Sequence, residues 1–121
     1  MPPNRSIHNG IDYASQTGTK IALKKPGKVL RIENKCIPGT FDCGGGYGNF
    51  VEIEHSSTIK TLYAHLSKVN VQPGQYIYKG KIIGETGNTG RSTGPHLHWE
   101  YKINNVKSNG TNFANDYFGL V

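Results

Sequence analysis

The sequence predicts an all-β domain, built mainly from antiparallel strands and containing little helix. Three observations support this class. Short segments alternate apolar and polar side chains with a period of two. Turns rich in glycine and proline, such as "KKPGK" and "QPGQ", separate these segments at short intervals. No window keeps the apolar period of about 3.6 residues that an amphipathic helix requires.

Five segments carry the strand pattern. Residues 28–34 ("KVLRIEN") alternate aliphatic with charged side chains. Residues 49–55 and 58–66 flank a short serine turn, so we expect them to form an antiparallel hairpin. Residues 76–87 form another β segment, broken by two glycines, and residues 96–104 ("HLHWEYKIN") give the clearest strand.

The strand at 96–104 sorts its side chains into two chemical sets. Successive side chains of a strand point to opposite faces, so alternate residues share a face. The apolar set can pack into a core while the other set presents two imidazoles on the opposite surface. That surface is either an ordinary polar face or one wall of a site. The two sets are His96, His98 and Glu100 on one face, and Leu97, Trp99 and Tyr101 on the other.

Length and charge limit the function classes. The 121 residues are enough for a single domain over 1–121 with its own core. The net charge of +6 favours polyanionic partners. We expect no nucleic acid among them, because aromatic residues are not interleaved with the basic ones as in single-strand binders.

No apolar run approaches the ~20 residues of a membrane span. The abrupt start at "MPPNRSIHNG" favours a domain excised from a larger parent protein.

Two cysteines, Cys36 and Cys43, bracket the stretch "CIPGTFDC". They do not form a CxxC metal pair, and the chain has no second pair to complete a thiolate zinc site. We favour a local disulfide in an exposed loop, with two free thiols as the alternative. So short a ring would stabilise the chain by ~2–3 kcal/mol at most in the chain-entropy model.

The stretch "HNGID" places His8 four residues before Asp12, with a glycine between them. A histidine and a carboxylate on a tightly folded backbone could grip one cation from two sides. Alone, the pair is more often a solvated histidine beside an unrelated aspartate. One more histidine would give three N/O ligands with a fourth position open, which is the layout of a catalytic zinc site.

Four stretches together resemble the lysostaphin-type zinc metallopeptidases that cut peptidoglycan cross-links. The resemblance runs from about His8 to Tyr101 with every signature element in order. It implies the lysostaphin-type fold, with short loops that form a groove, and one Zn²⁺ per chain. Only seven residues precede His8, and the loop "CIPGTFDCGGGYGN" is longer than usual, which are departures from the family pattern. The four stretches are "HNGIDYA", "YGNFVEIEH", "TLYAHLS" and "VQPGQYIYKGKIIGETGNTGRSTGPHLHWE".

The resemblance also implies a role for each site residue. His8 and Asp12 match the first two zinc ligands, and His98 matches the third. His65 and His96 match the two catalytic histidines that do not bind the metal. Bound zinc would lower the pKa of water towards ~7, and the two imidazoles would manage the proton and the developing oxyanion. Which of the two is the base stays open.

The roles of four further residues are less clearly defined by the sequence. Glu100 either orients a ligand through a hydrogen bond or is a solvated strand residue. Tyr63 either lines the groove beside His65 or packs in the core, and we name Tyr63 and Asn49 as substrate-groove candidates. His55 matches no catalytic position, and we expect it at the surface or behind a ligand.

The function implied by the resemblance is a zinc metalloendopeptidase that hydrolyses peptide cross-links of bacterial peptidoglycan. Anionic wall polymers would be further partners of the basic surface. Such an enzyme works outside the cell or facing the wall, as an autolysin, a secreted lysin or a lysin of a phage virion tail. The alternative is a catalytically silent regulator or adaptor of other wall hydrolases. The scissile bond, glycyl-glycine or D-alanyl-diaminopimelate, stays open.

Overall fold

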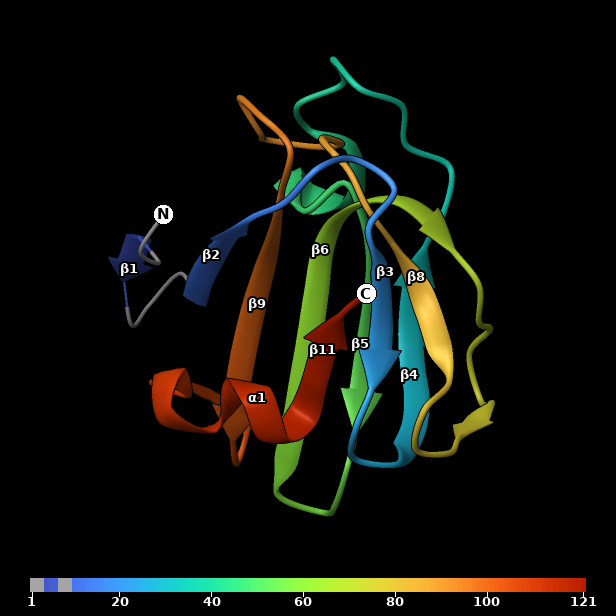
Figure 1. Ribbon diagram of the computed structural model, residues 1–121, viewed down its shortest axis with the longest axis vertical. Coiled ribbons are helices and arrows are strands. Elements are labelled where there is room, and N and C mark those ends of the chain that lie inside the picture. The colour runs from blue at the N-terminus through green and yellow to red at the C-terminus, as the bar shows by residue number, and fades with distance from the viewer. Residues whose placement is uncertain (1–3, 7–9) are drawn as a thin grey trace.

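The computed structural model describes residues 4–6 and 10–121 (Figure 1). In these residues, eleven strands join in one hydrogen-bonded sheet, and helix is confined to three short turns. The strands are β1 (Asn4–Ser6), β2 (Gly10–Ala14), β3 (Lys20–Leu23), β4 (Gly27–Glu33), β5 (Asn49–Glu54), β6 (Ile59–Val69), β7 (Tyr76–Ile77), β8 (Ile82–Thr86), β9 (His96–Ile103), β10 (Val106–Ser108) and β11 (Phe118–Leu120). The helical turns are η1 (Cys43–Gly46), η2 (Thr111–Phe113) and α1 (Ala114–Tyr117).

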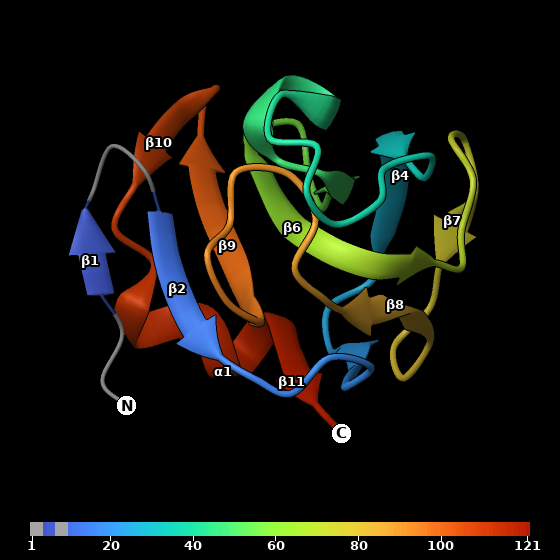
Figure 2. The ribbon, with the colours of Figure 1, turned by 90° about the horizontal axis from the view of Figure 1, so that it is seen from above.

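Strand β9 occupies the middle of the sheet. The main path runs β1-β2-β9-β6-β5-β4-β7, and β8, β3 and β11 branch from β6. All of these pairings are antiparallel, which confirms the predicted class. Seen from above, β2, β9 and β6 lie side by side and the segment between β8 and β9 arches over them (Figure 2). This arrangement brings loops from distant parts of the chain above the central strands.

The predicted strands are found with modified ends. The hairpin at 49–55 and 58–66 is β5 and β6, paired from Glu54 opposite Lys60, and β6 continues to Val69. The segment at 76–87 divides into β7 and β8, with the break around Gly80 and with Gly84 inside β8. An added Cβ at Gly84 would lie 2.5 Å from the Lys68 carbonyl oxygen, so glycine lets β8 pair closely with β6.

The core lies against the apolar face of β9. Leu97, Trp99 and Tyr101 are buried in it, as the alternation in the sequence predicts. The turn α1 and strand β11 cover this face, where Tyr117 and Phe118 pack against the Trp99 ring at centroid distances of 6.1 and 5.4 Å. The opposite face of β9 is therefore left for polar side chains.

The cysteine prediction is confirmed, because Cys36 and Cys43 form a disulfide. The neighbouring Asn49 side chain anchors the loop: its amide nitrogen donates to the Cys36 and Leu66 carbonyls, and its oxygen accepts from the Cys36 amide. Asn49 is 2% exposed, so its placement in the substrate groove is wrong. Its three hydrogen bonds use the side chain inside the protein.

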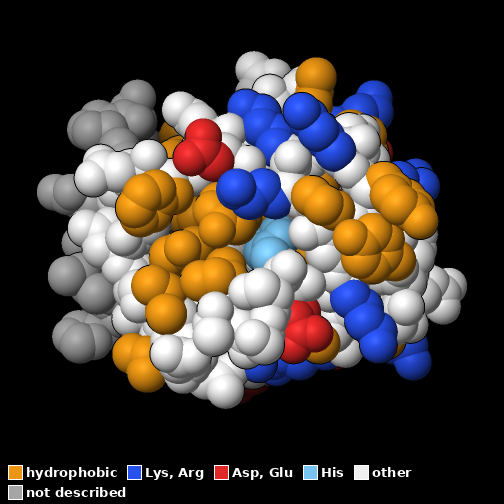
Figure 3. Space-filling view, turned by 90° about the horizontal axis from the view of Figure 1, so that it is seen from below, with side chains coloured by type: hydrophobic (Ala, Val, Ile, Leu, Met, Phe, Trp, Pro, Cys, Tyr) orange, Lys and Arg blue, Asp and Glu red, His pale blue; other side chains and the backbone are white. Residues whose placement is uncertain are grey.

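The surface matches the positive charge of the chain. Viewed from below, groups of apolar side chains are exposed, with basic side chains between them and along part of the edge (Figure 3). None of the helices in the described residues has both the length and the apolar character needed to cross a bilayer. The polar pocket lies on another face, above β9.

Candidate active site

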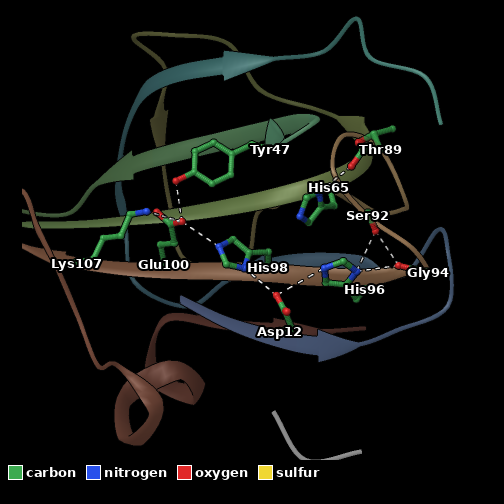
Figure 4. A network of polar contacts seen from close by, with 10 residues as sticks. All are labelled: Asp12, Tyr47, His65, Thr89, Ser92, Gly94, His96, His98, Glu100 and Lys107. Carbon is green, nitrogen blue, oxygen red and sulfur yellow. Dashed lines mark hydrogen bonds and ion pairs between the residues drawn. The ribbon is translucent and has the colours of Figure 1, made fainter. Parts of the chain in front are cut away.

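A cavity of about 540 Å³ opens on the polar side of β9. Its walls come from strands β2, β6, β9 and β10, from the loop that contains η1, and from the loop between β8 and β9. The cavity brings together five of the residues singled out in the sequence, Asp12, His65, His96, His98 and Glu100, as Figure 4 shows. The lining residues are Asp12, Gly45, Gly46, Tyr47, His65, Arg91, Ser92, Thr93, His96, His98, Glu100 and Lys107.

The pairing of β2 with β9 sets Asp12 directly opposite His98. The Asp12 Oδ1 atom lies 2.7 Å from His98 Nδ1. Gly10 allows the two strands to come this close: its φ is +89°, and an added Cβ would lie 2.5 Å from the Trp99 carbonyl oxygen. The glycine of "HNGID" thus allows β2 to approach β9 closely. His8 lies outside the described residues.

The second nitrogen of His98 is held from behind by Glu100. His98 Nε2 lies 2.9 Å from Glu100 Oε2, and the Tyr47 hydroxyl donates to the same oxygen at 2.7 Å. Lys107 Nζ lies 3.3 Å from it. Glu100 is 1% exposed, which rules out the solvated interpretation of this residue. A carboxylate behind an imidazole fixes the ring and leaves its other nitrogen for a ligand.

The charges of this cluster shift its pKa values. Burial alone would lower the pKa of His98, but its hydrogen bonds with Asp12 and Glu100 outweigh burial and raise the pKa to about 9. Burial alone would raise the pKa values of the two carboxyls, yet the hydrogen bond with His98 keeps both below their usual range. A positive charge at this position is therefore strongly favoured, whether carried by a proton or by a cation.

His96 stands beside the Asp12–His98 pair. Its Nδ1 lies 2.8 Å from the Gly94 carbonyl oxygen and 3.2 Å from Ser92 Oγ. Its Nε2 lies 3.6 Å from Asp12 Oδ1. The carbonyl can only accept a hydrogen bond, so Nδ1 carries the proton when the ring is neutral, and Nε2 then presents a lone pair towards Asp12.

His65 comes to the pocket through an irregularity in β6. Its φ is +64°, and the register of β6 against β5 shifts between Tyr63 and Leu66, on either side of this residue. Its backbone amide donates to the Tyr47 carbonyl, and its Nδ1 lies 2.7 Å from the Thr89 carbonyl oxygen. The ring centroid lies 4.7 Å from that of His96. Burial lowers the pKa of His65 to about 4, so the ring is neutral near pH 7.

The same irregularity corrects the interpretation of Tyr63. Regular alternation would put Tyr63 and His65 on one face, but the left-handed conformation at His65 breaks it. Tyr63 is fully buried in the core, and its ring packs edge-on against Phe118 at 5.5 Å. Tyr63 therefore does not line the groove.

The structure also adds residues that the sequence did not single out. Tyr47 and Lys107 contact Glu100, and Ser92 contacts His96. Tyr47 follows the glycine-rich stretch "CGGG" and Ser92 lies in "GRSTGP". Loops of this composition just before or between predicted strands are the available signal, although they do not say which side chain reaches the site.

The donor set fits a cation such as Zn²⁺. Asp12 and His98 turn an oxygen and a nitrogen towards each other, and carboxylate and imidazole are both ordinary zinc ligands. Within 10–121, no three His, Cys, Asp or Glu side chains are grouped to hold a metal. The third expected ligand, His8, is outside that range.

Comparisons with known proteins agree with the resemblance seen in the sequence. Residues 6–110 match the profile described as Peptidase family M23. The DD-carboxypeptidase/endopeptidase Mpg of Neisseria meningitidis serogroup B is 42% identical over 108 residues, which are 89% of this chain and 23% of that protein. The chain thus spans about a quarter of the length of the curated relatives that it matches.

Solved structures share the fold. A zinc-containing peptidase from Vibrio cholerae is 38% identical with a TM-score of 0.70, covering 83% of this chain and 28% of that one. The catalytic domain of the antimicrobial peptidase lysostaphin from Staphylococcus simulans is 30% identical with a TM-score of 0.73, covering 93% and 85%. With a family profile that spans most of the sequence and a fold shared with its solved members, this chain belongs to peptidase family M23.

Proposed function

We propose that this domain is a zinc-dependent endopeptidase that hydrolyses peptide cross-links of bacterial peptidoglycan. The observation that carries the proposal is the convergence of Asp12, His98, His96 and His65 in one cavity. The names of relatives support the substrate, since they include a DD-carboxypeptidase/endopeptidase and peptidoglycan DD-endopeptidases. The activity would lie outside the cell or at the wall, and a phage tail is one setting for it.

His8, Asp12 and His98 are the ligands that we propose for one Zn²⁺ per chain. His98 would bind through Nδ1, because Glu100 holds Nε2 and Asp12 Oδ1 lies beside Nδ1. When bound, the metal supplies Lewis-acid activation of water and of the peptide carbonyl. Glu100, with the Tyr47 hydroxyl on the same oxygen, would keep the His98 ring from turning.

His65 and His96 are the groups that we propose to move protons and to stabilise the oxyanion. Each has its Nδ1 held by a backbone carbonyl, so each neutral ring has its lone pair at Nε2. Such a nitrogen can accept a proton and, once protonated, donate a hydrogen bond to a developing negative charge. The low pKa of His65 favours the neutral form at the start of the reaction.

The test is digestion of purified sacculi with two cross-bridge chemistries, with product masses identified and zinc measured by elemental analysis. We expect one zinc per chain, cleavage of peptide bonds in at least one type of sacculus, and loss of cleavage with a chelator. Metal-free protein that cleaves neither sacculus would overturn the proposal. If that protein also stimulated a second wall hydrolase, the regulator alternative would replace it.

A further inference from the structure

Besides its histidines, the cavity is lined by one lysine and one arginine, and only the lysine contacts a buried group of the site. Lys107 Nζ lies 3.3 Å from the buried Glu100 carboxylate and 5.9 Å from the centre of the Tyr47 ring. Its charge is therefore balanced by the site itself. Arg91 instead has a single acidic contact, from one guanidinium nitrogen to Asp42 Oδ1 at 3.3 Å. Those two side chains are 69% and 96% exposed, and such a pair adds little stability.

The backbone at Arg91 is firmly placed even though its guanidinium is loosely held. The Arg91 amide donates to the Gly46 carbonyl at 2.8 Å, which joins the β8–β9 loop to the loop that contains η1. The side chain passes over Gly46, where an added Cβ would meet it at 3.9 Å. The next residue, Ser92, contacts His96. The guanidinium thus stands at the rim of the cavity, where two loops of the active site meet.

A guanidinium in this position is suited to bind a carboxylate. Its planar fork of N–H donors matches the two oxygens of a carboxylate, and charge-assisted bidentate pairs are stronger than neutral hydrogen bonds. Asp42 is nearly fully exposed, so a substrate carboxylate could displace it at small cost. The lining residues nearest Arg91 in the chain, Ser92 and Thr93, are uncharged and would not repel an anionic peptide.

We propose that Arg91 selects peptides that carry a free carboxylate on a residue next to the scissile bond. This inference rests on the proposed peptidase function and names its substrate class: anionic stem-type peptides rather than uncharged bridges made of glycine. Arg91 acts in this proposal as a specificity residue, since it does not contact the ligand pair or the histidines.

The experiment uses two synthetic peptides that differ only in this carboxylate, which is free in one and amidated in the other. The zinc-loaded protein is compared with Arg91→Gln, Arg91→Lys and a control, Lys79→Gln, which makes the same charge change on an exposed turn away from the cavity. For the free carboxylate, Arg91→Gln should lower kcat/KM by about 10- to 100-fold, mainly through KM. The amidated peptide should be cleaved at nearly unchanged rates by all four proteins, and Arg91→Lys should recover part of the loss.

Three results would overturn the inference. An equal loss on both peptides with Arg91→Gln would indicate a structural role. No loss on either peptide would show that Arg91 takes no part in recognition, and the same loss with Lys79→Gln would indicate general charge attraction. Zinc content and thermal stability are measured on every variant, so that misfolding is seen separately. Failure of the unmodified protein to cleave either peptide or any sacculus would instead overturn the proposed function.

Discussion

Two histidines of the β5–β6 hairpin, the half-buried His55 and the buried His65, show what separates a structural imidazole from a reactive one. Burial lowers the pKa of both. At the end of the β5–β6 hairpin, His55 uses both ring nitrogens, Nδ1 with the Pro26 carbonyl at 2.9 Å and Nε2 with Thr61 Oγ1 at 2.8 Å. Among the described residues, the His65 ring has a hydrogen-bond partner only at Nδ1, which is the Thr89 carbonyl oxygen.

The difference lies in the number of ring nitrogens that the fold has already engaged. His55 also packs edge-on against Tyr117 at 4.9 Å, so its ring ties the hairpin to α1. The His65 ring instead faces the cavity beside His96 (Figure 4). A histidine with one nitrogen held and the other turned into a cavity has a defined tautomer and a lone pair to offer, which is what proton transfer requires.

Replacing each histidine by alanine should give the largest contrast. His65→Ala should lower kcat on a soluble peptide by about 10²- to 10⁴-fold, because it removes a proton-transfer or oxyanion group, while zinc stays bound. His55→Ala should change kcat by less than about threefold, because both of its hydrogen bonds are structural. Peptide kinetics with parallel zinc determination check this. Loss of zinc with His65→Ala would move that residue into the ligand set.

His98 differs from both of these histidines, because each of its ring nitrogens lies beside a carboxylate. His98→Ala should abolish tight zinc binding, because it removes a proposed ligand. Glu100→Gln should weaken zinc binding by about 10- to 100-fold, which is typical when a group behind a ligand is changed. His96→Ala should bind zinc normally. Competition with a chromophoric chelator measures all three affinities. Normal binding by His98→Ala together with zinc loss by His96→Ala would reverse the two assignments.

The loop closed by the disulfide supports His65 but not His55, so removing the bond should affect the two regions differently. The Tyr47 carbonyl accepts from the His65 amide, and the Cys43 carbonyl accepts from Gly48. A Cys36→Ser, Cys43→Ser double variant should lose at most ~2–3 kcal/mol of unfolding free energy, because the ring is short. Zinc should persist.

The same double variant also tests the part that the loop plays in recognition. Activity on sacculi should fall more than activity on a small soluble peptide, because an exposed loop contacts only the larger substrate. Denaturant unfolding, zinc analysis and paired rate measurements check these expectations. Equal rates on the two substrates, relative to the unmodified protein, would leave the loop without a role in wall recognition.

The smallest expected effect is on pH-dependent stability, and it arises at His55. Its folded pKa lies below the usual 6.5, because burial and the nearby Lys25 disfavour the charged ring. The unfolded chain therefore binds more protons between those two pKa values, so this histidine's contribution is present above about pH 6.5 and is lost as the pH falls. His55→Gln should make the decline of Tm from pH 7.5 to 5 shallower. An unchanged slope would show that other groups cause it.

The regular parts of the fold could be predicted from the sequence because they follow side-chain periodicity. Alternation in β9 placed Leu97 and Trp99 in the core and His98 in the site, and the β5–β6 hairpin was found at its expected place. Strands β1, β2, β3, β10 and β11 were not predicted. They are three to five residues long, too short to show a clear alternation, and pairing with other strands of the sheet defines them.

The irregular parts of the fold could not be predicted. The two errors in the predicted groove arise from the backbone conformation of His65 and from the buried side chain of Asn49. A positive φ at His65 is unfavourable by itself and is held by the surrounding contacts. The alternation of apolar and polar residues in the sequence gives no sign of such a conformation. Tyr63 was misplaced for that reason. Asn49 was misplaced because a polar side chain can satisfy buried backbone groups instead of facing solvent.

The contact between Asp12 and His98 has a consequence for the order of folding. It joins residues 86 positions apart in the chain, and the pairing of β2 with β9 that creates it spans the same distance. Folds dominated by such non-local pairs form slowly, on a scale of milliseconds to seconds. The nascent or partly unfolded chain therefore lacks the contact between these two proposed ligands, and zinc binding during refolding should report the completion of the central sheet and not its first hairpin.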